Sequence, residues 1–210
     1  MPDAIALFPF LLGDRWNGLP PVVKQMHAAN RATFARGRVD VRGDRGLIAR
    51  AVRACLHMPA PGNELPIEVE IRRDGCRERW LRKFPDADMV SMLQPSRQVP
   101  GLFEEQLGFV HAQFALAIDR NALRWEIQRA RAFGVPLPTR WFAGARAHCG
   151  EKDGRYIFHI AIRLPVMGLL VGYTGWLEIT RVEPYERAGN DGSAASATHA
   201  DIDTLARIAR

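Results

Sequence analysis

The fold is decided by the stretch Phe158-His159-Ile160-Ala161-Ile162-Arg163-Leu164-Pro165-Val166-Met167-Gly168-Leu169-Leu170-Val171-Gly172-Tyr173-Thr174-Gly175-Trp176-Leu177-Glu178-Ile179. Its apolar residues recur at every second position, which is the period of a half-buried β-strand. A Pro/Gly turn signal over residues 165–168 divides the stretch into two strands. Residues 141–149 add a third run, and Lys152-Asp153-Gly154 marks the turn that follows it. The sequence therefore predicts a three-stranded antiparallel meander at the heart of one sheet.

Two short helices are predicted ahead of most strands. Proline in the first turn favours a helix over residues 19–30, and a second helix over residues 45–58 follows a strand over residues 33–41. In the second helix, three-four spacing predicts one buried apolar stripe, with the arginines facing water. The stripe comprises Leu47, Ile48, Ala51, Val52, Cys55 and Leu56, and the arginines are Arg45, Arg50 and Arg53.

From Pro66 onward the apolar period is two, and short turns separate the strands. So many consecutive strands usually curl into a barrel or a strongly bent sheet. The sequence predicts an α+β fold with two short N-terminal helices and a strongly curved, largely antiparallel sheet or barrel of about 8–10 strands. Residues 1–183 are expected to form a single domain. Residues 184–210, rich in Gly, Ser and Ala, are expected to form a flexible tail that could carry a short helix.

The chain of 210 residues has a formal net charge of +6 and a pI of about 9.8. Its arginines are spread along the sequence and never form a basic run, and Trp80 and Trp125 fall in phase with core positions. Both observations argue against a nucleic-acid partner. A solvated basic surface explains the charge, and an acidic partner or substrate is the alternative.

Three widely spaced cysteines, Cys55, Cys76 and Cys149, predict neither a disulfide framework nor a cysteine zinc site, and a reducing cytoplasm fits them. The apolar run over residues 4–12 is too short to span a bilayer and lacks the features of a signal peptide, so no integral membrane segment is expected. This run either docks on the core or forms a weak interfacial anchor.

A polar cluster is predicted on the meander. If Asp153-Gly154 is a two-residue turn, His148 faces His159, and Arg146 and Arg163 share their side of the sheet. Such a cluster could receive a carboxylate or phosphate with a histidine as acid or base, or it could be the solvated face of the sheet. His148, His159 and His27 are the candidate catalytic residues.

No phosphate-binding loop, metal-ligand spacing or nucleophile motif is present, so no cofactor and no metal are expected. Aromatic residues at predicted interior positions favour binding of a small apolar or amphipathic molecule, or a lipid, in the concave face of the sheet. The expected interior aromatics are Trp80, Phe114, Trp125, Phe158, Tyr173 and Trp176. The candidate ligand-binding residues are Arg146, Arg163, Trp80, Arg82, Trp125, Tyr173 and Trp176.

From about Leu19 to Glu178 the chain resembles the family called domain of unknown function 4166. The resemblance is carried by residues 19–27, Gly43, 47–56, Pro59, 80–84, Ser91, Leu93, Glu104 or Glu105, Gly108, 134–138 and, most specifically, 164–177. Related domains also occur fused behind NAD-binding modules that resemble saccharopine dehydrogenase, which implies an accessory role or an oxidoreductase partner. The family pattern commonly has acidic residues at the positions of His148 and His159, so this chain departs from it there.

Two further functions remain open alongside ligand binding. An enzyme could act on an acidic small molecule through the histidines and arginines, which requires at least one histidine in a cleft beside a charged group. An interaction module could instead dock on a separately encoded NAD-dependent oxidoreductase.

Overall fold

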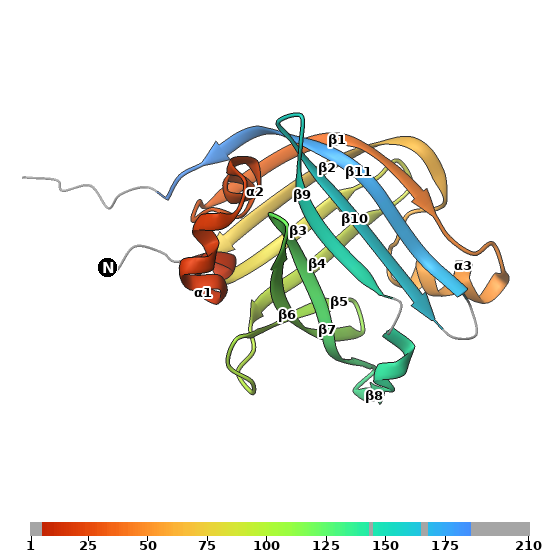
Figure 1. Ribbon diagram of the computed structural model, residues 1–210. Helices are drawn as coiled ribbons and strands as arrows, with labels where there is room; N and C mark the ends of the chain where they lie inside the picture. The colour runs from red at the N-terminus through yellow and green to blue at the C-terminus, as the bar shows by residue number, and fades with distance from the viewer. Residues whose placement is uncertain (1–5, 143–144, 165–167, 186–210) are drawn as a thin grey trace, which may run out of the picture.

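A computed structural model of the protein describes residues 6–142, 145–164 and 168–185. In these residues ten strands close into an antiparallel barrel, and an eleventh, β8, extends the sheet beside β7 (Figure 1). The strands are β1 (Ala32–Arg42), β2 (Gly62–Asp74), β3 (Arg77–Lys83), β4 (Asp88–Pro95), β5 (Leu102–Leu107), β6 (Val110–Asp119), β7 (Ala122–Ala132), β8 (Val135–Leu137), β9 (Arg146–Lys152), β10 (Arg155–Leu164) and β11 (Gly168–Glu183). The helices are α1 (Leu7–Leu12), α2 (Pro21–His27) and α3 (Leu47–Cys55), with 3-10 turns η1 (Gly13–Gly18) and η2 (Thr139–Phe142).

The barrel closes where the first strand meets the last. β1 pairs with β11 from Ala32 opposite Glu183 to Arg42 opposite Gly172. Two glycines allow this close pairing: a Cβ at Gly37 would lie 1.8 Å from the carbonyl oxygen of Trp176, and one at Gly175 would lie 2.2 Å from that of Arg38. The largely antiparallel sheet or barrel predicted from the sequence is thus a closed barrel, and β structure predominates more than the α+β description implied.

The predicted meander is confirmed. β9 pairs with β10, and β10 pairs with β11, all antiparallel. Asp153 and Gly154 have φ angles of 53° and 74°, the left-handed pair required by a two-residue type I′ hairpin turn. This turn sets the register that places His159 opposite His148 and Ala161 opposite Arg146.

The barrel is less completely joined between β7 and β9. β9 pairs with β7 only from Leu123 opposite Cys149 to Trp125 opposite Ala147. Further along β7, β8 takes the same edge over Ala130–Ala132. Residues 126–129 of β7 therefore lack a described strand neighbour on this side.

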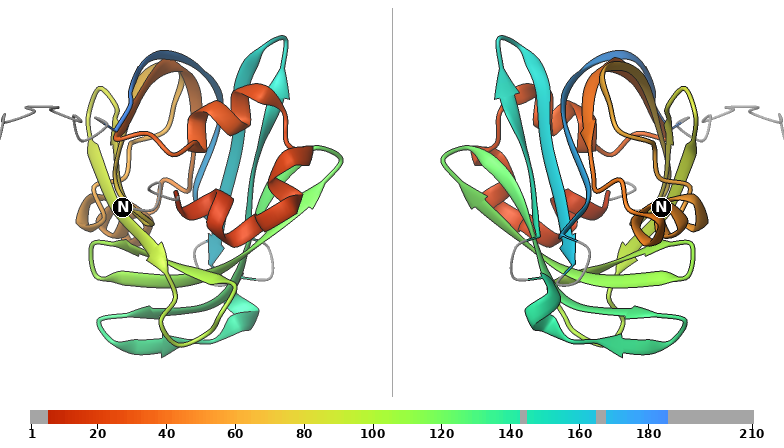
Figure 2. Two further views of the ribbon diagram at one scale, coloured as in Figure 1. Left: turned by 90° about the vertical axis from the view of Figure 1, so that its left-hand side faces the viewer. Right: turned by 90° about the vertical axis from the view of Figure 1, so that its right-hand side faces the viewer.

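The two ends of the barrel differ. At the α2 end, where β1 begins and β11 ends, α1 and α2 lie across the opening (Figure 2). Leu7, Phe8, Val23 and Met26 are completely buried in the core there. The first of the two expectations for the N-terminal apolar run, docking on the core, is confirmed for residues 6–12, and their helix α1 was not predicted. At the α3 end, where β1 ends and β11 begins, α3 lies beside the rim (Figure 1).

Helix α3 was predicted correctly in place, but only part of its predicted buried stripe is buried: Val52 and Leu56 pack against the core. Leu47 and Ile48 are 80% and 65% exposed, and Ala51 and Cys55 are also exposed. Arg53, expected to face water, is buried instead. Its Nη1 donates hydrogen bonds to the carbonyl oxygens of Asp44, just after the end of β1, and of Leu170, near the start of β11. Sequence periodicity identifies the two faces of a helix but not which face meets the protein.

The sequence also predicts a flexible C-terminal tail and no integral membrane segment. The proposed tail over residues 184–210 lies outside the described residues except for Pro184 and Tyr185. No helix in the described part of the chain is long and apolar enough to cross a membrane.

Candidate functional site

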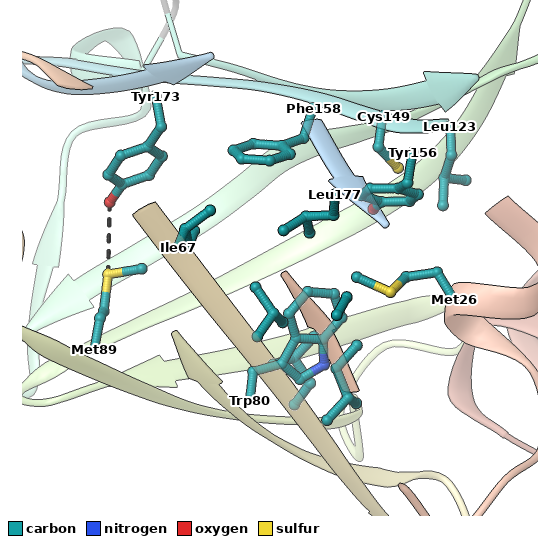
Figure 3. Close-up of a cluster of buried hydrophobic side chains, with 14 of the residues drawn as sticks. Met26, Ile67, Trp80, Met89, Leu123, Cys149, Tyr156, Phe158, Tyr173 and Leu177 are labelled. Carbon is teal, nitrogen blue, oxygen red and sulfur yellow. Dashed lines mark hydrogen bonds between the residues drawn. The ribbon is translucent and has the colours of Figure 1, made fainter. Parts of the chain in front are cut away.

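The barrel encloses a cavity of about 140 Å³. Side chains from β2, β3, β5, β7, β9, β10 and β11 form most of its wall, and Figure 3 shows several of them. The apolar lining includes Met58, Ile67, Phe114, Trp125, Phe158 and Leu177. The cavity exists because the alternation of each strand sends every second side chain inward and ten strands enclose more space than these side chains fill.

A buried ionic network fixes the floor of the cavity at the α2 end. Arg73 Nε lies 3.1 Å from Glu78 Oε1, and both side chains are completely buried. Arg73 also donates to Thr33 Oγ1 and to the carbonyl oxygen of Met26, the latter at 2.7 Å in the last turn of α2. Glu78 Oε2 accepts a hydrogen bond from Trp80 Nε1 at 2.8 Å. The network therefore joins α2 to the sheet and orients the Trp80 ring toward the cavity.

Burial raises the pKa of Glu78, while the charge of Arg73 and the hydrogen bonds from Trp80 and Arg73 lower it. The stabilising contacts made to both carboxylate oxygens are those expected of the charged form. Glu78 thus completes a structural pair that lies behind the cavity wall.

His27 lies in the same region but behind the cavity wall. Its ring packs against Phe8 at a centroid distance of 4.1 Å, and its Nε2 lies 3.1 Å from Tyr156 Oη. Its buried Nδ1 has no hydrogen-bond partner among the described residues. Burial, assisted by the charge of Arg73, holds the pKa of His27 well below its usual value, so the ring is neutral at pH 7.

Tyr156 and Cys149 line the cavity next to this histidine. Burial raises the pKa of Tyr156 well above its usual value, and the Cys149 thiol adds to that rise. Burial also raises the pKa of Cys149 to about 12, although a hydrogen bond with Tyr156 opposes the rise. Both groups therefore stay protonated, and the thiol is a poor nucleophile.

A charged pair stands in the otherwise apolar wall. Arg82 points inward from β3, where its Nη1 donates to Ser91 Oγ at 3.0 Å and its Nη2 lies 3.6 Å from Glu105 Oε1. The side chains of Arg82 and Glu105 are 15% and 17% exposed. The guanidinium carbon also lies 4.8 Å from the centre of the Trp80 ring. Because the guanidinium carries five N–H donors, this pair leaves donors available to a polar ligand group.

Tyr173 supplies another polar group, its hydroxyl, to the cavity wall. Its hydroxyl donates to Met89 Sδ at 3.5 Å (Figure 3). Its ring stacks on Phe84. Burial raises the pKa of Tyr173, so its hydroxyl is neutral. The Tyr173 hydroxyl oxygen can therefore accept a hydrogen bond from a ligand.

The cavity reaches solvent toward the α3 end. Lining residues near that end are partly exposed, among them Leu107, Ile127, Ala145 and Ile162. At the α2 end the lining residues Met26, Trp80 and Tyr156 are buried. A ligand would therefore enter from the side of α3 and of the diverging strands β7 and β9.

The structure brings the two predicted meander histidines together on the outer face of the barrel. The rings of His148 and His159 stack at a centroid distance of 5.1 Å, and His159 Nδ1 lies 2.7 Å from Thr174 Oγ1. His148 also belongs to the residues around the cavity, at the β7–β9 divergence. Arg163 is exposed. The side chain of Arg146 and the whole of Gly144 lie outside the description.

Four of the predicted ligand-binding residues, Trp80, Arg82, Trp125 and Tyr173, line the cavity. Trp176 does not, and its expected interior position is wrong: it alternates with buried Leu177 on β11 and lies under Arg155, whose guanidinium carbon is 4.2 Å from the ring centre.

The candidate site residues predicted from the sequence did not include Glu105. Its phase with Phe103 and Leu107 on β5 was the available signal, because these residues share the inner face. Within the described residues no group of three or more acidic, histidine or cysteine side chains could hold a metal ion.

Comparison with known families adds one finding. The family model described as Domain of unknown function (DUF4166) matches residues 19–177. The chain belongs to the DUF4166 family. The match covers the DUF4166 barrel from two residues before α2 to the middle of β11, and it includes both Arg82 and Glu105. No curated protein and no solved structure matches this DUF4166 chain.

Proposed function

We propose that the barrel binds a small apolar or amphipathic molecule in its interior. The observation that carries the proposal is the apolar cavity with one inward-facing charged pair, Arg82 and Glu105. Concave, mostly apolar sites with a few convergent polar groups are the usual form of small-molecule sites. The family has no activity attached to its description, so the proposal rests on this geometry.

The size of the cavity limits the ligand. Pockets for drug-sized molecules typically measure about 300–1,000 Å³, whereas cavities near 150 Å³ hold molecules of the size of benzene. At about 140 Å³ this cavity suits a single ring or a slender chain. Met26, Met58 and Met89 all line it, and these flexible side chains can move to admit a somewhat longer molecule.

The position of the charged pair limits the chemistry of the ligand. An apolar group would lie among Trp125, Phe158 and Leu177, and a polar head would reach Arg82. A carboxylate could take a bidentate contact from the guanidinium, in competition with Glu105. A neutral ligand would leave the Arg82–Glu105 pair intact.

Catalysis by the three candidate histidines has less support. His27 is completely buried behind Tyr156, and the rings of His148 and His159 stack on the outer face. The oxidoreductase partner stays a prediction from the family resemblance.

Two measurements test the proposal. Native mass spectrometry of freshly purified protein should show a bound molecule, and calorimetric titration with toluene and with benzoate should show binding to emptied protein. Ala147→Phe places a ring in the cavity and should abolish toluene binding. Ala117→Phe, the same substitution on the outer side of β6, should retain it.

Loss of benzoate binding in Arg82→Met with retained toluene binding would assign the head-group contact to Arg82. The proposal is wrong if the protein carries no ligand and binds neither probe, or if Ala147→Phe folds and binds as well as the unmodified chain.

A further inference from the structure

Helix α3 presents its apolar side to solvent. Ala49 and Arg53 are its buried residues, and they lie on the side that meets Leu170 of β11. Leu47, Ile48, Ala51, Ala54 and Cys55 are exposed, and at 100° per residue they form one continuous arc. A monomeric protein rarely leaves such an arc uncovered without a binding role.

Further exposed apolar side chains lie at the same end of the barrel. Phe133 and Val135, in the β7–β8 hairpin, are 77% and 63% exposed. Phe133 stacks on Phe109 at a centroid distance of 4.0 Å. The neighbouring Gly108 is also close to α3, since a Cβ there would lie 3.4 Å from Leu56 Cδ2. Gly108 and Phe109 thus lie between the C-terminal end of α3 and the hairpin, at the end where the cavity reaches solvent.

Four exposed arginines lie at the same end of the barrel. Arg50 lies beside Leu47 on α3, Arg45 precedes the helix, and Arg163 and Arg140 lie at the same end on β10 and η2. None of these four belongs to an ion pair found among the described residues. The carboxylate of nearby Asp44 accepts a hydrogen bond from the Gly46 amide at 2.6 Å.

We propose that the α3 end docks on the surface of an anionic lipid bilayer. Amphipathic helices with an apolar face and flanking basic residues insert shallowly at such surfaces, and arginines gain from the negative potential there. A second copy of the chain is a poorer occupant, because a symmetric contact through α3 would bring Arg45 and Arg50 toward their own counterparts. The docking goes beyond ligand binding and requires no occupied cavity.

Vesicle sedimentation tests this docking. The protein should pellet with vesicles of equal parts phosphatidylcholine and phosphatidylglycerol, remain in solution with phosphatidylcholine alone, and dissociate as salt is raised. Leu47→Ser with Ile48→Ser should lower the partition coefficient at least about tenfold because two large apolar side chains are lost. Arg45→Gln with Arg50→Gln should lower it about tenfold through the lost charge.

Two matched variants supply controls. Val90→Ser with Met92→Ser removes two exposed apolar residues from the outer wall of β4, and Arg77→Gln with Arg79→Gln removes two exposed arginines from β3. Both should bind vesicles as the unmodified protein does, and circular dichroism should show every variant folded. Equal losses in control and α3 variants would overturn the proposal. The absence of vesicle binding would also overturn it. In that case, conversion of a dimer to a monomer by the α3 variants would identify a second copy of the chain as the occupant.

Discussion

At the scale of single residues, the buried pair Arg73–Glu78 has the largest energetic consequence. Each charge has lost its water, and each is compensated only by the other and by a few hydrogen bonds. Removing one member of such a pair leaves the other uncompensated in a medium of low polarity. The pair therefore makes the attachment of α2 to β2 and β3 sensitive to conservative changes.

Glu78→Gln should destabilise the protein by about 3–5 kcal/mol, because Arg73 stays charged and buried. Urea unfolding measures this loss. Glu70→Gln is the matched control, since Glu70 pairs with Arg72 where both side chains are partly exposed, and it should cost less than about 1 kcal/mol. Equal effects of the two substitutions would contradict the account.

His27 should make stability depend on pH. Its folded pKa lies well below the ordinary 6.5, so the unfolded chain binds more protons below that pH. The contribution of neutral, buried His27 to the free energy of unfolding is fully present above about pH 6.5. It is lost as the pH falls toward the folded pKa, by up to about 1.4 kcal/mol per pH unit.

The measurement is the difference in unfolding free energy between the unmodified protein and His27→Gln from pH 7.5 to pH 5. Taking the difference separates His27 from Glu78, whose raised pKa contributes in the opposite direction. His111→Gln, which changes an exposed histidine on β6, is the matched control substitution. A flat difference for His27→Gln would show that its ring is not desolvated in solution.

At the scale of elements, the β1–β11 pair depends on glycine. The Gly37 position has no room for a side chain, because a Cβ would overlap the Trp176 carbonyl oxygen. Gly37→Ala should therefore push the two strands apart and cost about 3 kcal/mol, as severe overpacking does. Thermal unfolding measures the change. Gly18→Ala, at a site with nothing within 4 Å of the added atom, should be close to neutral.

The sequence predicts the strands more completely than it predicts the orientation of helix α3. Alternation in β10 and β11 and the Asp153-Gly154 turn specify local pairing, because a two-residue hairpin fixes the register of its own strands. The orientation of α3 depends on Arg53 reaching the carbonyl of Leu170, more than a hundred residues away. Neighbouring residues contain no signal for such a contact, so the exposed face of α3 could not be predicted.

The candidate site was predictable in part for the same reason. Trp80, Arg82, Trp125 and Tyr173 follow from the inward phase of their strands. The distance between Arg82 and Glu105 depends on β3, β4 and β5 lying side by side, and the empty volume depends on the barrel's closure. Neither the Arg82–Glu105 distance nor the cavity volume can be predicted from one segment of the sequence alone.

At the scale of the whole molecule, the barrel is a sequential meander closed by one long-range pair. β11 pairs with β1 from one end of β1 to the other, and it also pairs with β10. A chain ending after Tyr185 should keep the thermal midpoint, because the described barrel is complete at that residue. A chain ending after Leu164 should not fold, because β1 and β10 would both lose their partner.

Circular dichroism during heating distinguishes these outcomes, and size-exclusion chromatography checks that each shortened chain is compact. A clearly lower midpoint for the chain ending after Tyr185 would show that residues 186–210 contribute to the barrel's stability.

The placement of α2 and the end of β11 at the same end has a consequence for fusion and immobilisation. A domain, tag or surface joined directly before α1 or directly after Tyr185 is tethered beside α1 and α2, on the far side of the molecule from α3. The barrel would then stand with its cavity opening and its arginine-rich rim directed away from the attachment point. A barrel attached at either of these two junctions should consequently remain able to bind ligand or vesicles from free solution.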